Sequence, residues 1–357
     1  MKRSLAALAL LSSFIGQASA QASSVTIFGI IDAAGRSVTN ESVGTVKSLV
    51  SGANNTGRFG FRGQEDLGDG LKASFWLESD VGADVGEGGN ENGFWNRRST
   101  VSLSHDKRGE IRLGRDYTPT HYATCFVDAF NCVGVAGIYT LRTTGASVLA
   151  AGTGLGATAP LTRANNSIHY YSPVVNGFML HAMVAAAEGR ITGAVENSKL
   201  YGLRLGYANN VVDVRAAMIE IRNTALPGAP TFKDFAFGAL YKFTEVSVGI
   251  HHRQQRVNAE KLAIWTGNVQ VPVGAHNFKA QYQSMNQSGA RSLNDASMIG
   301  LGYEYNLSKR TALYASFGRV DNEGAGTIAI SGGPAVTATT FGGKKSAGYE
   351  AGLRHSF

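Results

Sequence analysis

The sequence predicts an all-β chain that closes into an antiparallel transmembrane β-barrel of sixteen strands. The first observation is an alternation of apolar and polar residues along the whole chain, which is the period of a strand whose two faces meet different environments. The second is the order of the connections, because short turns and long polar loops tend to alternate. The third is an export signal at the start of the chain, and no segment shows a sustained helical period.

Residues 1–20 predict a secretory signal peptide. Lys2 and Arg3 precede an apolar run from Leu5 to Ile15, and Ala18-Ser19-Ala20 has the small-x-small pattern of a cleavage site. An anchoring transmembrane helix is the alternative, but the run is shorter than the roughly 20 apolar residues that a span needs. We therefore expect residues 1–20 to be removed and residues 21–357 to form the barrel.

Sixteen segments of the remaining chain carry the alternation. In one of them Phe59 and Phe61 alternate with Arg58 and Arg62, and turn signals such as Asn176-Gly177 separate neighbouring segments. The expected strand cores are 24–34, 57–65, 71–80, 98–105, 110–117, 166–172, 177–188, 198–208, 211–221, 231–243, 245–256, 259–271, 276–286, 295–306, 311–321 and 347–357.

We expect the apolar side of each strand to face outward. A soluble sandwich would bury the apolar sides, but both of its sheets would then expose a very large polar, Arg-bearing face. In a membrane barrel the apolar side meets lipid, the polar side lines a wet lumen, and closure leaves no unpaired backbone edge. Aromatic residues at strand ends could supply the interfacial girdles: Phe28, Tyr117, Tyr170, Tyr171, Phe243, Tyr282, Tyr303, Tyr305, Tyr314, Phe317, Tyr349 and Phe357.

The chain ends on a strand rather than on a polar tail. Tyr349, Ala351, Leu353, His355 and Phe357 share one side, which is apolar except for the imidazole. We expect this side to meet lipid and the strand to pair with segment 24–34, so that the last strand closes the barrel against the first.

The ordered set of these segments resembles the general porins of Gram-negative bacteria, in particular the betaproteobacterial and neisserial branch. The resemblance implies a water-filled channel in the outer membrane for passive diffusion of ions and small hydrophilic solutes. It implies a homotrimer, a third outer loop that folds into the barrel, and a last strand (Tyr349, Leu353 and Phe357) read by the barrel assembly machinery. The segments that carry it are "SSVTIFGIIDAA", "RFGFRGQEDLGDGLKASFWLES", "FWNRRSTVSLS", "GEIRLGRDYTP", "NNSIHYYSP" and "GLRHSF".

The long connection at about 118–165 matches the inward-folded loop of that family. Loops longer than about 15 residues in a compact domain are usually functional. The family sets acidic residues on this loop against a ladder of arginines on the barrel wall. By position, the ladder would be Arg58, Arg62, Arg98 and Arg163, with Lys72 and Arg112 nearby, and parity already places the first three on the lumen side.

Few acidic residues are available to face these arginines across the constriction. Asp128 is the only acid between Thr118 and Asn165, and Asp116 lies just before the loop on the lumen side. Because rings of basic side chains favour anions, we hypothesise an anion preference.

Cys125 and Cys132 flank Asp128 within the loop. An exported chain with an even pair of cysteines favours a disulfide, which would pinch the tip of the loop. Two free thiols remain the alternative, because spacing alone does not bring the Cα atoms within bonding distance.

Other functional classes find little support. "GTGLGA" lacks the strand and helix that a dinucleotide loop requires, and no Cys/His spacing indicates zinc. No Gly-x-Ser-x-Gly motif is present, and the charge pattern does not form a nucleic-acid footprint. We expect no enzyme activity, no cofactor, and outer-membrane lipid or lipopolysaccharide as surroundings. A substrate-selective porin is the first alternative, and a barrel enzyme or adhesin is the second.

Overall fold

The computed structural model describes residues 24–90, 93–141, 162–186, 198–223 and 231–357. The predicted signal peptide at 1–20 lies outside these residues. No helix among them is long and apolar enough to cross a membrane.

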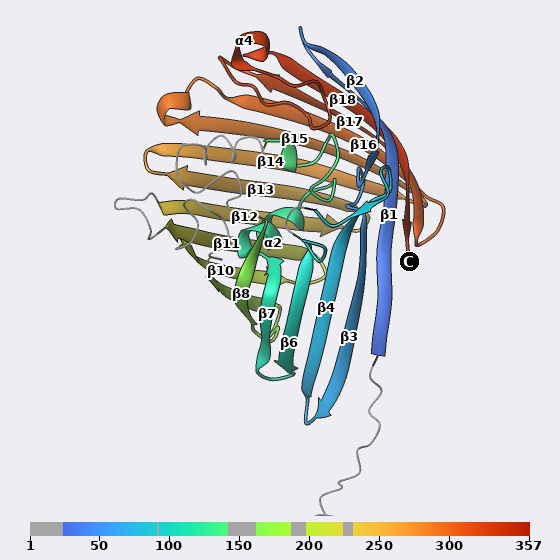
Figure 1. Ribbon diagram of the computed structural model, residues 1–357, viewed down its shortest axis with the longest axis vertical. Coiled ribbons are helices and arrows are strands. Elements are labelled where there is room, and N and C mark those ends of the chain that lie inside the picture. Colours follow the sequence, from blue (N-terminus) through green and yellow to red (C-terminus); the bar gives the residue numbers. More distant parts are fainter. Residues whose placement is uncertain (1–23, 91–92, 142–161, 187–197, 224–230) are drawn as a thin grey trace, which may run out of the picture.

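Sixteen strands of the described chain form a closed antiparallel barrel (Figure 1). Eighteen strands are present in all, and two short ones, β2 (Gly44–Ser51) and β5 (Glu87–Gly88), belong to loops. Each predicted strand core corresponds to one barrel strand. These are β1 (Ser24–Asn40), β3 (Arg58–Gly68), β4 (Leu71–Gly82), β6 (Arg98–His105), β7 (Gly109–Tyr117), β8 (Arg163–Tyr171), β9 (Phe178–Ala186), β10 (Ser198–Ala208), β11 (Val212–Asn223), β12 (Thr231–Phe243), β13 (Val246–Val257), β14 (Glu260–Val273), β15 (His276–Ser288), β16 (Ala296–Asn306), β17 (Thr311–Asn322) and β18 (Lys345–Ser356).

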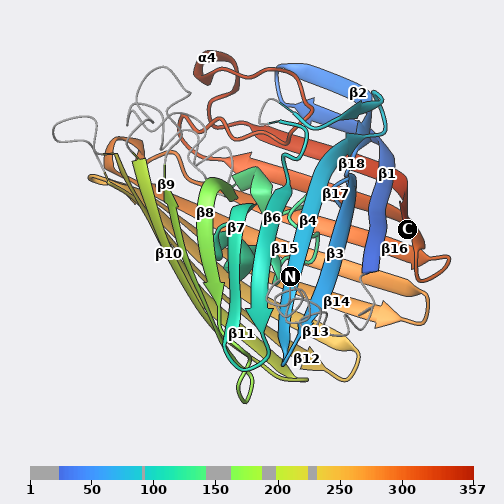
Figure 2. The ribbon, with the colours of Figure 1, turned by 60° about the horizontal axis from the view of Figure 1, so that its bottom comes forward.

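The first and last strands close the barrel. β1 pairs with β3 from Ser24 to Ile30 and with β18 from Ile30 to Asn40. In Figure 2 β1 lies between β3 and β18, as this register requires. The final residue extends the pairing, because the Phe357 N–H donates to the Gly29 carbonyl and the Gly29 N–H donates to the Phe357 carbonyl. The predicted seam at the C-terminus is therefore present.

The β1–β2 hairpin departs from the sequence prediction, which ended the first strand at residue 34 and expected a loop to follow. β1 continues to Asn40, turns through Ser42 and Gly44 at positive φ, and returns as β2 along its own second half. The Ser51 hydroxyl at the end of β2 donates to Asp84 at 2.6 Å. Polar and small residues interrupt the alternation here, so the strand pattern is weak in the sequence.

The barrel is apolar outside and polar inside, as the alternation predicts. Leu103 and Ile168 are exposed on the outer face, whereas Gln283 and His169 are buried on the lumen side. The girdle prediction is wrong for four aromatic residues, because the contacts of their rings or hydroxyls are with lumen groups: Phe28, Tyr117, Tyr171 and Tyr314. Phe28, Tyr171 and Tyr314 follow the alternation of their own strands, which outweighs their position near a strand end. In β7 a register shift between Gly114 and Asp116 interrupts the alternation, so Tyr117 faces the lumen as Asp116 does.

The connection after β7 folds into the barrel. It begins with the short helix α2 (Pro119–Cys125), which Thr118 caps through its hydroxyl and which contacts β9, β10, β11 and β12. Figure 1 shows α2 enclosed by the strands. Inward-facing glycines let the loop approach the wall: a Cβ added at Gly318 would lie 1.9 Å from the Val135 carbonyl oxygen, and one at Gly238 would meet the Val127 side chain at 2.7 Å.

Candidate functional site

The described part of the inward loop, residues 118–141, is bound to the barrel wall along its length. The Asn268 side chain donates to the Val127 carbonyl at 3.0 Å, and the Gln281 side chain donates to the Ala136 carbonyl at 3.2 Å. Further round the barrel, the Val135 N–H donates to the Glu350 carboxylate at 3.0 Å. These contacts reach from β14 to β18, so the loop follows one wall and leaves the opposite wall, β3 to β8, facing the remaining lumen.

Asp128 does not line the lumen, which corrects its assignment to the acidic side of the constriction. Its carboxylate accepts hydrogen bonds from the backbone N–H groups of Phe130, Cys132 and Ile138, at 3.1, 2.7 and 3.1 Å. The residue is 5% exposed. Burial raises the pKa of this carboxyl, and the three N–H donors oppose that rise. Asp128 therefore organises the turn of the loop instead of presenting charge to solutes.

A disulfide joins Cys125 and Cys132 across this turn, with the Cα atoms 5.6 Å apart. It connects the end of α2 to the segment that Asp128 binds, so the disulfide and the Asp128 hydrogen bonds to Phe130 and Cys132 constrain the same stretch of chain. The pairing is the first of the two alternatives that the sequence left open.

An arginine cluster occupies the wall opposite the loop, centred on Glu78 and the Tyr117 hydroxyl. Arg97 donates to Glu78 at 2.5 Å and to Tyr117 at 2.9 Å, and Arg58 lies 3.7 Å from Glu78. Arg163 donates to the Tyr117 hydroxyl at 2.6 Å, with its guanidinium 4.2 Å from the centre of that ring. The structure thus brings the predicted Arg58 and Arg163 together.

Arg97 is a site residue that sequence reasoning missed. It precedes β6, so the alternation of that strand does not reach it and only Arg98 was placed on the lumen side. Arg97 also donates to Asp80 at 2.8 Å and is 4% exposed. The adjacent pair Arg97-Arg98 in "WNRRST" was the available signal.

A second cluster follows along β6 and β7, around Asp116. Arg112 donates to Asp116 at 2.5 Å and to Glu110 at 2.9 and 3.0 Å. Arg98 lies 3.7 Å from Asp116 and 4.4 Å from the centre of the Trp76 ring. Asp116 is fully buried and is held by these two cations. This arrangement neutralises the acid that the sequence placed on the lumen side.

Arg62 extends the basic wall toward the short-turn end of the barrel. Its guanidinium lies 5.4 Å from the centre of the Phe28 ring and 5.2 Å from that of Trp76. Arg62, Arg98 and Arg112 line a polar recess of about 450 Å³ together with serine, threonine and glutamine side chains.

Lys72 does not belong to the constriction. Its ammonium lies 3.1 Å from Asp106, in the turn between β6 and β7 at the end of the barrel. The alternation along β4 predicted the correct face for Lys72. It does not tell how far along the barrel axis a residue lies, which explains the error.

The closed barrel, its apolar outer wall and the loop across its charged lumen define a transmembrane channel protein. A family model described as Gram-negative porin matches residues 4–325, and the chain belongs to that family. It is an outer-membrane porin, which is a channel and not an enzyme.

Relatives cover most or all of the chain. Outer membrane porin protein 32 of Delftia acidovorans is 35% identical over 100% of both chains. Major outer membrane protein P.IB of Neisseria gonorrhoeae is 28% identical, with 89% of this chain and 93% of the relative covered. Among solved structures, the anion-selective porin from Comamonas acidovorans superposes with a TM-score of 0.81 at 33% identity, covering 94% of this chain and 100% of that one.

Proposed function

We propose that the constriction prefers anions. The observation that carries this proposal is an imbalance between lumen cations and lumen acids. Arg62, Arg163 and Arg204 contact aromatic rings or a tyrosine hydroxyl, and none of them forms a salt bridge with an acid among the described residues. Their positive charge therefore adds to the field in the lumen.

Most lumen acids, by contrast, are neutralised locally by a cation, whereas Asp32 accepts hydrogen bonds from the Tyr314 hydroxyl and from the Asn54 and Asn55 N–H groups. Glu78 lies against Arg97, Asp234 against Arg253, and Glu304 against both Lys279 and Arg354. Glu350 is bound in the same way by Arg36. Basic side chains around a narrow pore favour anions, so an excess of cations without paired acids favours chloride and organic anions over potassium. The anion-selective porin of Comamonas acidovorans, a relative at 33% identity, supports the same conclusion.

The reversal potential in a salt gradient tests this proposal. Purified protein in a planar lipid bilayer, with a tenfold gradient of potassium chloride, should give a reversal potential of the sign set by chloride. A reversal potential of the potassium sign would overturn the proposal without affecting the assignment to the porin family.

We also propose the assembly that the family resemblance implies. Residues 1–20 act as a cleaved signal peptide, the mature chain forms a homotrimer, and the barrel assembly machinery binds the last strand. Tyr349, Leu353 and Phe357 support this, because they are exposed on the outer face of β18 and beyond its end. Lipopolysaccharide and other outer-membrane lipids contact the remaining outer wall. Deletion of Phe357 should lower the yield of folded barrel in the outer membrane, and an unchanged yield would exclude this role.

A further inference from the structure

A recess of about 450 Å³ opens in the lumen wall toward the short-turn end of the barrel, where β1, β3, β4, β6 and β7 lie side by side. Polar residues of neighbouring strands form a row across its floor. Gln64 of β3 faces Ser74 of β4, and Ser74 faces Ser102 of β6. Adjacent strands lie about 4.8 Å apart, so the floor presents a polar side chain at each such step.

The neutral side chains on this floor have no partner in the protein. Among the described residues, no protein group forms a hydrogen bond with the side chain of Gln64, Ser74, Ser102 or Ser104. All four residues are at least partly exposed. Hydroxyl and amide groups both donate and accept hydrogen bonds, so this floor is suited to the hydroxyl groups of a solute.

Arg62 supplies the recess with a positive charge that no acid neutralises. Its guanidinium lies 5.4 Å from the centre of the Phe28 ring and 5.2 Å from that of Trp76. Aromatic faces attract a cation without a salt bridge, and Arg62 forms no salt bridge or side-chain hydrogen bond with another described residue. Its N–H groups are therefore available to an oxyanion. Arg62 and Gln64 share one face of β3 two residues apart, about 7 Å along the strand, so one solute can contact both.

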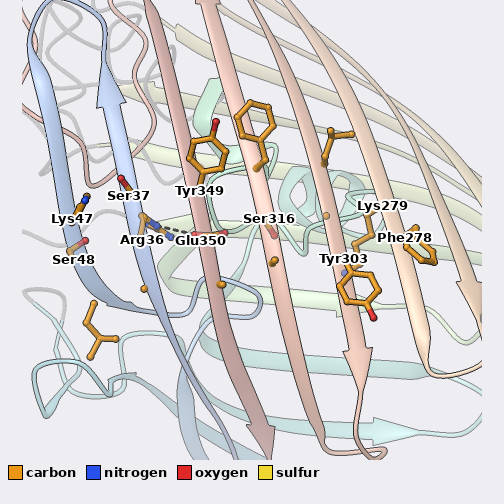
Figure 3. A pocket seen from close by; sticks show the side chains of 17 residues that line it. Arg36, Ser37, Lys47, Ser48, Phe278, Lys279, Tyr303, Ser316, Tyr349 and Glu350 are labelled. Carbon is orange, nitrogen blue, oxygen red and sulfur yellow. Dashed lines mark hydrogen bonds and ion pairs between the residues drawn. The ribbon is translucent and has the colours of Figure 1, made fainter.

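The other two arginines of the recess are already bound to an acid. Arg112 donates to Asp116 at 2.5 Å, and Arg98 lies 3.7 Å from the same carboxylate. Elsewhere in the lumen, Arg36 is bound to Glu350 in a similar way, at 2.7 Å (Figure 3). The recess therefore offers one uncompensated positive charge beside a row of neutral polar groups.

We propose that this recess binds polyhydroxylated monocarboxylates, the chemical class of sugar acids such as gluconate. The carboxylate accepts hydrogen bonds from Arg62, and the hydroxyl groups of the solute bind Ser74, Ser102 and Gln64. The volume of the recess lies within the range of small-molecule sites. One free cation matches one carboxylate, whereas a solute with two negative charges leaves one of them unpaired.

This inference rests on the anion preference proposed above and deepens it. The positive field of the lumen attracts any small anion, whereas the hydroxyl row distinguishes between anions of equal charge. A carboxylate without hydroxyls uses Arg62 but not the full floor, and a neutral polyol uses the floor but not the charge. Each neutral hydrogen bond that a solute lacks weakens its binding about twofold to tenfold.

Block of the chloride current tests the site on the unmodified channel. Purified protein in a planar bilayer carries a chloride current in potassium chloride, and gluconate, hexanoate or sorbitol is added in increasing concentration. Hexanoate has the length and charge of gluconate without its hydroxyls, and sorbitol has hydroxyls without the charge. The half-blocking concentration of gluconate should be at least about tenfold lower than that of either other solute, because only gluconate uses both parts of the site.

Substitutions in the recess show whether it causes this difference. The double change Ser74→Ala and Ser102→Ala should raise the half-blocking concentration of gluconate about tenfold and leave that of hexanoate unchanged. Arg62→Gln should raise both at least about tenfold, because hydrogen bonds to a charged group are stronger. Ser316→Ala is the matched control and should change neither, because Ser316 faces Glu350 on β17, outside the recess (Figure 3).

The outcomes separate this site from the anion preference. Equal block by gluconate and hexanoate, or a preference for gluconate that survives the double change, would overturn the site and leave the anion preference intact. Block by sorbitol at the concentration of gluconate would refute the role of Arg62 and the proposal with it. A reversal potential of the potassium sign, measured on the same channels, would overturn the anion preference and this inference together.

Discussion

Neutralising Arg163 should reduce the anion preference of the channel by a factor that can be worked out from its position. Its guanidinium is fixed by the Tyr117 hydroxyl at 2.6 Å and has no acidic partner among the described residues. An anion that passes within about 6 Å gains about 0.7 kcal/mol in water, and screening at 0.1 M salt reduces this to about 0.4 kcal/mol. That energy changes the partition of the anion about twofold.

A cation loses the same energy that an anion gains, so the ratio of chloride to potassium permeability should fall about threefold to fourfold in Arg163→Gln. The assay is the reversal potential in a bilayer. Arg163→Lys keeps the charge and should remain close to wild type. At 1 M salt, where the Debye length is about 3 Å, the effect should shrink below about 1.5-fold.

Lys233→Gln provides the matched control for a loss of one charge outside the lumen. Its side chain is 62% exposed and lies 3.8 Å from Glu220, so the permeability ratio should not change. The reasoning fails if Arg163→Gln leaves the ratio at its wild-type value in 0.1 M salt, or if Lys233→Gln lowers it equally.

The inward loop yields three further predictions. Gly318→Ala should lower single-channel conductance, because its Cβ would push the loop off the wall into the lumen, whereas Gly267→Ala, which meets open space, should not. The double change Cys125→Ser and Cys132→Ser should lower the free energy of unfolding by about 2.5 kcal/mol, because the disulfide restricts the unfolded chain. Denaturant titration measures this, and an unchanged midpoint would contradict it. Asp128→Asn should cost about 1–3 kcal/mol by the same titration, because it weakens three backbone hydrogen bonds. Asp128→Asn should leave the reversal potential unchanged, and a shift of the reversal potential would show that Asp128 lines the pore.

The strands could be predicted closely because their signal is local. Side chains alternate between the two faces of a strand, so the sequence alone assigns Phe59 to the outer face and Arg58 to the lumen face. The same reasoning places Phe28 inward with Thr26, against the expectation that an aromatic residue at a strand end lies in the girdle. Where the alternation along a strand and the position near a strand end predicted different faces, the alternation was correct. The reason is that moving one residue to the other face would move every residue of its strand.

The site was only partly predictable, because its function depends on partners that are distant in the sequence. Arg98 and Arg163 look alike in the sequence, yet Asp116 lies beside Arg98 and a tyrosine lies beside Arg163. Asp128 looked like the acid of the constriction, but the path of the loop turns its carboxylate toward backbone N–H groups. Inward glycines such as Gly318 were a usable signal, since glycine inside a strand often marks a close backbone approach.

The sequence by itself determined the number and order of the barrel strands, the face of most side chains and the position of the long loop. These properties depend on period, composition and turn chemistry within a few residues. Only the tertiary structure decided which arginines keep an unneutralised charge, which end of the pore Lys72 occupies, and that Gln64, Ser74 and Ser102 lie in one row. The physical reason is that strand register and the path of the loop bring together residues far apart in the chain.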